Sequence, residues 1–267
     1  MSLSDLPAEA SRTLAFLRRN WIMSRRNAFT IFEILFWPLV GMVSVGLLAE
    51  FLSLPASTRS FILIGVISMG TVQVCQLDVA YVLLYDVWSK SLKHAFIAPV
   101  SIRHFLLGSW AAGMVRGLCV FAILAAGGAL CFGFDLRPAG PAAIALFLAA
   151  LFLDALLIGL CVCILVLLLG NRAEVAAWSL VSLMMLLCGI YYPVTILPAP
   201  VLVLARLFPL TYHLDYFRSF YGVQAAFGHN LAIGNGLVLL YLLASLYALS
   251  KAMKRAAKTG IVLRLSE

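Results

Sequence analysis

Long apolar runs dominate the chain, and short segments that hold most of the charged residues separate them. A helix needs about 20 apolar residues to cross the hydrocarbon core of a bilayer. Six runs meet this requirement, at residues 28–49, 61–84, 105–132, 142–169, 175–197 and 231–250. Because lipid cannot satisfy backbone polar groups, each run is predicted to be a helix. The pattern therefore predicts an all-α integral membrane protein, a single transmembrane domain (residues 1–267) with a six-span bundle at residues 28–250.

The composition supports this prediction. Hydrophobic residues make up 64% of the 267 residues, charged residues make up 11%, and the mean hydropathy is +1.05. A soluble domain carries about 25% charged residues. So few charges cannot cover a water-facing surface of this size, which excludes a soluble enzyme. The first apolar run begins too late and is too long for a cleavable signal peptide, so we expect the N-terminus to be retained.

The basic residues predict the orientation. The net charge is +8, and lysine and arginine gather before the first run, between the second and third, between the fourth and fifth, and after the sixth. Such residues stay on the cytoplasmic side, so both termini are expected there, with residues 251–267 as a basic cytoplasmic tail. The same placement favours the surface of the cytoplasmic membrane over nucleic acid as the partner of these charges.

The segment before the first run (residues 1–27) has an amphipathic pattern. Leu6, Leu14, Leu17 and Trp21 share one helical face, and most charged residues lie elsewhere. This pattern predicts a helix lying in the plane of the membrane interface, with arginines toward anionic headgroups. A simple basic flank with no further role is the alternative.

The loop between the second and third runs predicts a short amphipathic cytoplasmic helix. Its apolar side chains share one face, its lysines share the other, and Pro99 ends it. Such a helix either lies on the bilayer or docks in a groove of a partner protein, and we favour docking. The residues expected to couple the chain to a partner are Asp86, Trp88, Lys90, Leu92, Lys93 and Phe96.

The connection between the fifth and sixth runs is long and too apolar for a solvated loop. Pro193 should interrupt the fifth helix, which predicts a broken re-entrant helical pair that forms a gate or a pathway wall. A cap of short interfacial helices is a compatible alternative. Its aromatic residues fit either a headgroup-level belt or a stacking surface for sugars. The candidate gate residues are Gly189, Tyr191, Tyr192, Pro193, Pro198, Pro209 and Arg218.

Four charged residues fall inside the predicted spans: Glu33, Asp78, Arg116 and Asp154. A charge in hydrocarbon costs roughly 2.5–3.5 kcal/mol even on the mildest scale, so these side chains should face the bundle and pair. Arg116 and Asp154 reach similar depths, and we expect them to pair, with Asp78 as the competing partner. Such a pair either locks helices together or forms a polar element of a transport pathway.

Several kinds of chemistry are absent from the sequence. It contains no GxxxxGK[ST] phosphate-binding loop, no HExxH or GxSxG motif and no paired-cysteine metal motif. The chain is therefore not expected to be an enzyme, to hold a metal or to bind a cofactor itself.

The loop after the second run ends in Ala98-Pro99-Val100-Ser101. This ending resembles the small-Pro-Val-Ser exit from the coupling helix in the membrane subunit of type-2 ATP-binding-cassette exporters. The chain departs from the family in the lead into this helix, where the usual acidic and arginine-rich segment is reduced to Asp86 with two lysines. The resemblance therefore implies the general docking role of this helix but not the identity of its charged contacts to a partner.

A second pattern lies before the last run, and with the order of the predicted elements it extends the resemblance over nearly the whole chain. It is similar to the family's Gly-x-aromatic-aromatic-Pro, Leu-Pro, Pro, Arg series, and consists of Gly189-x-Tyr191-Tyr192-Pro193, Leu197-Pro198, Pro209 and Arg218.

The resemblance implies that two copies of the chain form the pathway in the membrane, with two separate ATPase subunits beneath them. ATP and magnesium would then bind to the partner subunits, and residues 88–96 would dock in a groove of the ATPase. The implied activity is export of a lipid, a glycolipid or polysaccharide, or a hydrophobic small molecule.

Two other functions compete with this one. A self-contained secondary transporter would carry out ion-driven flux as a single chain. A membrane-embedded enzyme would need a cluster of catalytic carboxylates or histidines at one interface, and the four histidines are scattered.

Overall fold

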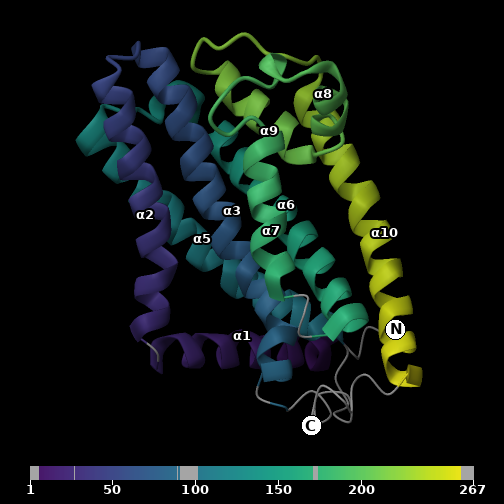
Figure 1. The fold of residues 1–267 in the computed structure, drawn as a ribbon. Helices are drawn as coiled ribbons and strands as arrows, with labels where there is room; N and C mark the ends of the chain where they lie inside the picture. Colours follow the sequence, from purple (N-terminus) through teal and green to yellow (C-terminus); the bar gives the residue numbers. More distant parts are fainter. Residues whose placement is uncertain (1–5, 27, 89, 91–101, 171–173, 260–267) are drawn as a thin grey trace.

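The computed structural model describes residues 6–26, 28–88, 90, 102–170 and 174–259, and it contains no strand within them (Figure 1). The all-α membrane fold predicted from the sequence is confirmed. The elements are α1 (Leu6–Arg26), α2 (Ala28–Phe51), α3 (Ala56–Trp88), α5 (Ile102–Phe132), η2 (Arg137–Ala139), α6 (Gly140–Leu169), α7 (Glu174–Leu187), η4 (Val194–Ile196), α8 (Ala199–Ala205), α9 (Pro209–Ser219) and α10 (Asn230–Thr259).

Five of the described helices are long and apolar enough to cross a membrane, namely α2, α3, α5, α6 and α10. The fifth predicted run corresponds to α7, whose apolar part is only Val175–Leu187. The predicted end of this span at residue 197 was wrong, because the helix stops well before Pro193. Gly189 adopts a φ of +69°, a left-handed conformation that favours glycine and commonly ends a helix.

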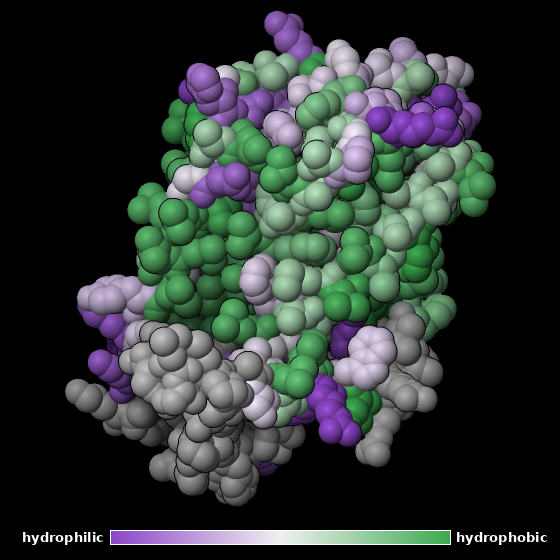
Figure 2. Space-filling model, turned by 180° about the vertical axis from the view of Figure 1, so that it is seen from behind, coloured by the Kyte–Doolittle hydropathy of each residue, from purple (hydrophilic) through white to green (hydrophobic). Residues whose placement is uncertain are grey.

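The central helix of the bundle is α3, which packs along both α5 and α6. Within its apolar span 78% of the residues are buried, whereas the corresponding share is 22% for α2 and 17% for α10. The outer helices α2 and α10 therefore present apolar side chains to lipid or to another chain. Figure 2 shows a broad apolar band across one face of the molecule, with polar residues toward its two ends.

The first helix lies across one end of the bundle, as expected of an interfacial helix (Figure 1). It packs on the first half of α5, where the rings of Phe16 and Phe105 are 3.8 Å apart. Gly108 allows this approach, because an added Cβ would lie 2.7 Å from Cβ of Phe16. The end of α3 and the end of α10 lie on the same side of the molecule (Figure 1).

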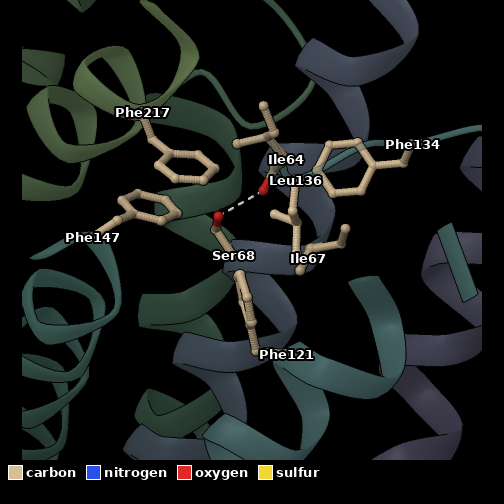
Figure 3. Close-up of a pocket in the computed structure, with 8 residues that line it drawn as sticks. All are labelled: Ile64, Ile67, Ser68, Phe121, Phe134, Leu136, Phe147 and Phe217. Atoms are coloured by element: carbon tan, nitrogen blue, oxygen red, sulfur yellow. Dashed lines mark hydrogen bonds between the residues drawn. The ribbon is translucent and has the colours of Figure 1, made fainter. Parts of the chain in front are cut away.

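Residues 188–229, which we call the cap segment, cover the opposite end of the bundle (Figure 1). This segment contains η4, α8 and α9, and α9 packs against α6 and α10. The stacked rings of Phe217 on α9 and Phe147 on α6, with centroids 4.1 Å apart, are part of this contact (Figure 3). The cap segment is thus a folded part of the bundle and not an open loop.

Candidate functional site

The cap segment is organised around Arg218, which comes from the last turn of α9 and is only 3% exposed. Its guanidinium donates hydrogen bonds to three backbone carbonyls, those of Gly189 (2.7 Å), Ile190 (2.8 Å) and Phe61 (3.2 Å). The same group lies over the ring of Phe61, with 3.5 Å between its carbon atom and the ring centroid. Arg218 therefore joins α9 to the end of α7 and to α3.

These hydrogen bonds explain how α7 can end inside the protein. Backbone carbonyls that follow the end of a helix have no partner within it, and leaving such groups buried and unpaired is costly. Arg218 binds the two carbonyls that follow α7, while Gly65 on α3 leaves room for them. An added Cβ at Gly65 would lie 2.0 Å from the carbonyl oxygen of Ile190.

The predicted prolines begin elements of the cap segment. Pro193 precedes η4, Pro198 precedes α8, and Pro209 is the first residue of α9. Proline suits these positions because they need no backbone N–H donor within the helix. Tyr192 donates a hydrogen bond from its hydroxyl to the carbonyl of Leu186, and Tyr191 is exposed. All seven candidate gate residues thus lie in the cap segment, and Arg218 binds the backbone carbonyl of another of them, Gly189.

Inside the bundle, Arg116 on α5 pairs with Asp78 on α3. The expected pairing of Arg116 with Asp154 was wrong, and the competing partner is the one found. The physical reason is that α3 packs along both α5 and α6, so Arg116 meets a carboxylate on α3 first. The helices approach closely there, since an added Cβ at Gly113 on α5 would lie 3.2 Å from Cβ of Asp78.

This pair is also connected to the first helix. Arg116 donates a second hydrogen bond to the backbone carbonyl of Asn20, 3.3 Å away, and the side-chain amide of Asn20 donates to Ser109 on α5. The first helix, α3 and α5 therefore share one polar network near the end of the bundle where α1 lies.

Asp154 pairs instead with His213 on α9, and the distance from its Oδ2 to His213 Nδ1 is 2.8 Å. Both side chains are fully buried in the contact between α6 and α9. His213 was not among the candidate residues identified from the sequence. The sequence contained one indication of this pairing. Asp154 in the middle of an apolar run needs a polar partner, and His213 lies in the apolar cap segment.

The residues expected to contact a partner lie at the end of α3 and beyond it. Asp86 and Trp88 belong to the last turn of α3, which continues past the predicted end of the second span. Trp88 is exposed and contacts the rings of Tyr81 and Tyr85. Lys90 is exposed, with a φ of +56°. Leu92, Lys93, Phe96 and Pro99 lie outside the described residues, as does the side chain of Glu33 on α2.

Figure 3 shows a pocket beneath the cap segment, where α3, α5, α6 and α9 meet. It is too narrow to admit a water molecule. Its lining is apolar except for Ser68, whose hydroxyl donates to the carbonyl of Ile64. This pocket cannot hold a transported molecule. The described residues also contain no group of three or more His, Cys, Asp or Glu side chains that could hold a metal ion.

Comparison with known proteins agrees with this architecture. A short protein of Archaeoglobus fulgidus, described as an uncharacterized protein, is 51% identical over 53 residues, which is 20% of this chain and 83% of that protein. Residues 11–221 match the family model described as ABC-2 type transporter. This match begins in α1, includes the buried network around Asp78 and ends just after Arg218. The chain therefore belongs to the ABC-2 type transporter family of membrane proteins.

Proposed function

We propose that the chain is the permease subunit of an ATP-driven exporter in the cytoplasmic membrane, with two copies forming the pathway and two separate ATP-binding-cassette subunits supplying the energy. Membership of the ABC-2 family supports the permease role. The lack of a phosphate-binding loop in the sequence supports hydrolysis by a partner that binds ATP and magnesium. The permease itself is then not catalytic.

One observation carries this proposal. The most buried helix, α3, runs without a break from the cap segment to the exposed ring of Trp88. Its first turns contact Arg218 through Phe61, Asp78 lies ten residues before its last residue, and its last turn leads into the segment expected to dock on the ATPase. A helix of this length spans about 50 Å, which is enough to cross the membrane and connect both surfaces.

The orientation follows from the charges. With α1, the end of α3 and the basic end of α10 in the cytoplasm, Lys251, Lys254 and Arg255 lie at the inner surface, as the positive-inside rule requires. The cap segment then lies at the outer surface. A gate at this position favours a pathway that is closed to the outside at rest.

A pathway between two copies explains why a single chain is closely packed beneath the cap. Two helices carry large exposed apolar side chains suited to a partner copy: Phe36, Trp37, Val40 and Leu47 on α2, and Val175, Trp178, Leu183 and Leu186 on α7. The substrate would be a lipid, a glycolipid or polysaccharide, or a hydrophobic small molecule. The exposed aromatic residues Tyr191 and Phe220 of the cap segment suit molecules of these classes.

The proposal is tested by purifying the tagged chain from its native membrane in mild detergent. We expect an ATP-binding subunit in equal amount, with ATP hydrolysis that vanadate inhibits. Recovery of the chain alone, repeated after crosslinking, would contradict the proposal and favour a self-contained secondary transporter. Ion-driven flux by the purified chain in vesicles would then identify that alternative.

A further inference from the structure

The contact between α9 and α6 combines an apolar and a polar part. His213 and Phe217 lie one turn apart on α9, and Asp154 and Phe147 lie two turns apart on α6, so each pair shares one face of its helix. Phe217 stacks on Phe147 with an angle of 7° between the rings, and His213 binds Asp154. The face of α9 that meets α6 is thus defined by these two contacts.

The polar part of this contact is incompletely satisfied. Within the described part of the chain, Asp154 Oδ1 and His213 Nε2 are buried and have no hydrogen-bond partner. A buried polar atom without a partner costs free energy, so the closed arrangement is stabilised less than a fully satisfied network would be. Weaker stabilisation helps a contact that must separate and re-form, because less free energy is needed to open it. A permanent contact gains nothing from weaker stabilisation.

A glycine on α10 leaves space for the imidazole ring of His213. Gly234 on α10 lies against it, and an added Cβ at Gly234 would be 2.6 Å from His213 Nε2. The neighbouring Asp215 accepts hydrogen bonds from the backbone amides of Ala226 and Phe227 and from the side chain of Asn230 at the start of α10. The helix α9 is therefore held by α10 on one side and by α6 on another.

We propose that the Asp154–His213 pair is a latch that holds α9 against α6 while the outer end is closed, and that it separates during each transport cycle. The inference rests on the proposed transport function and assigns the moving contact within the gate. His213 and Asp154 are positioning residues, because they act on the placement of α9.

Cys188 provides a native reporter of this movement. It lies just after α7, is 1% exposed, and its thiol lies beside Thr211 on α9. Release of α9 from α6 would uncover this thiol. A membrane-impermeant maleimide applied from the outside, followed by peptide mass spectrometry, measures its exposure in the full chain within native membranes. Cys163, which is fully buried between α3 and α6, serves as the internal negative control.

Asp154→Asn replaces the carboxyl group with an amide and keeps the shape of the side chain. Because an amide is a weaker hydrogen-bond partner for the imidazole than a carboxyl group, we expect Cys188 to react about tenfold faster in this variant at rest. The exchange Asp154→His with His213→Asp restores the pairing of a carboxyl group with an imidazole and should restore protection. The matched control Asp135→Asn removes an exposed carboxylate near the same end and should leave the rate unchanged. Equal rates in Asp154→Asn and the wild type would overturn the proposal.

A second measurement uses the wild-type chain and tests the latch even if the Asp154→Asn variant does not reach the membrane. In the complex with its ATPase, trapping with ATP and vanadate should accelerate labelling of wild-type Cys188. If an ATPase subunit co-purifies but trapping leaves the labelling unchanged, the latch is wrong and the permease function stands. If no ATPase subunit co-purifies while Asp154→Asn still exposes Cys188, the latch stands and the proposed function fails.

Discussion

The carbonyl oxygen of Ile190 lies directly against Gly65, so close that a Cβ at this glycine would be 2.0 Å from the oxygen. This contact brings the segment after α7 onto α3, and Arg218, which binds the same carbonyl, also lies close to Gly65. The cap segment can therefore pack this closely on α3 only because residue 65 is a glycine, which has no side chain.

Gly65→Ala should displace residues 189–190 and weaken their hydrogen bonds to Arg218. Overpacking of this kind costs about 1–3 kcal/mol, and a backbone atom cannot rotate away as a side chain can. We expect a lower midpoint of thermal unfolding in detergent. Gly41→Ala is the matched control, because nothing lies within 4 Å of its added Cβ, and alanine favours the helix. Equal unfolding midpoints for the two variants would contradict the role of Gly65.

Arg218→Lys should impair the cap although it keeps the positive charge. The planar guanidinium binds three carbonyls from three nitrogen atoms, and a single ammonium group cannot reproduce this geometry. We expect transport by the reconstituted complex to fall about tenfold or more, which corresponds to the loss of one charged hydrogen bond. Arg206→Lys, which changes an exposed arginine of the same segment, is the control. Full activity of Arg218→Lys would show that the charge alone suffices.

The pairing of Arg116 with Asp78 predicts a specific pattern of rescue. Removing either partner should destabilise the chain by about 3–5 kcal/mol, because a buried charge is left without its partner. The double variant Arg116→Met with Asp78→Leu should recover much of this loss, whereas Arg116→Met with Asp154→Leu should not. Free energies of unfolding from a double-mutant cycle would measure the difference. Rescue by the second combination alone would instead support the pairing with Asp154.

Leu92→Asp or Phe96→Asp should uncouple ATP hydrolysis from transport without unfolding the chain. A carboxylate on the apolar face of the docking segment would oppose its insertion into a groove of the ATPase. Hydrolysis and transport measured on the same vesicles should therefore separate. Thr58→Asp, at an exposed position near the opposite end, is the control. Normal transport in both docking variants would remove the coupling role from this segment.

The positions of the helices along the chain were predicted more accurately than the residues at which the helices end. Apolar runs of about 20 residues report burial in lipid directly, which is why α2, α5 and α6 lie close to the predicted spans. The last helix, α10, begins as predicted but continues to Thr259, past the predicted end at residue 250 and into the predicted basic tail. The end of α7 was misplaced because the break depends on Gly189 and on carbonyl binding by Arg218, which is 29 residues further along the chain. Local periodicity contains no information on such a contact.

The partners of the buried charges were predictable only in part. Depth along each span suggested that Arg116 and Asp154 could meet, but which helices are neighbours depends on three-dimensional packing. The helix between them, α3, supplies the carboxylate that Arg116 meets, and the cap segment supplies the histidine for Asp154. That a helix outside the six spans would reach Asp154 could not be read from hydropathy.

The position of Asp78 along α3 has a mechanical consequence. This residue divides the helix unequally, with about 15 Å from Asp78 to Trp88 and about 25 Å from Asp78 to Phe61 at 1.5 Å per residue. A tilt of α3 about its ion pair with Arg116 would act as a lever with a short inner arm and a long outer arm. A small displacement at the ATPase would then become a larger one beneath Arg218, and spin labels at the two ends of α3 would record movements of unequal size.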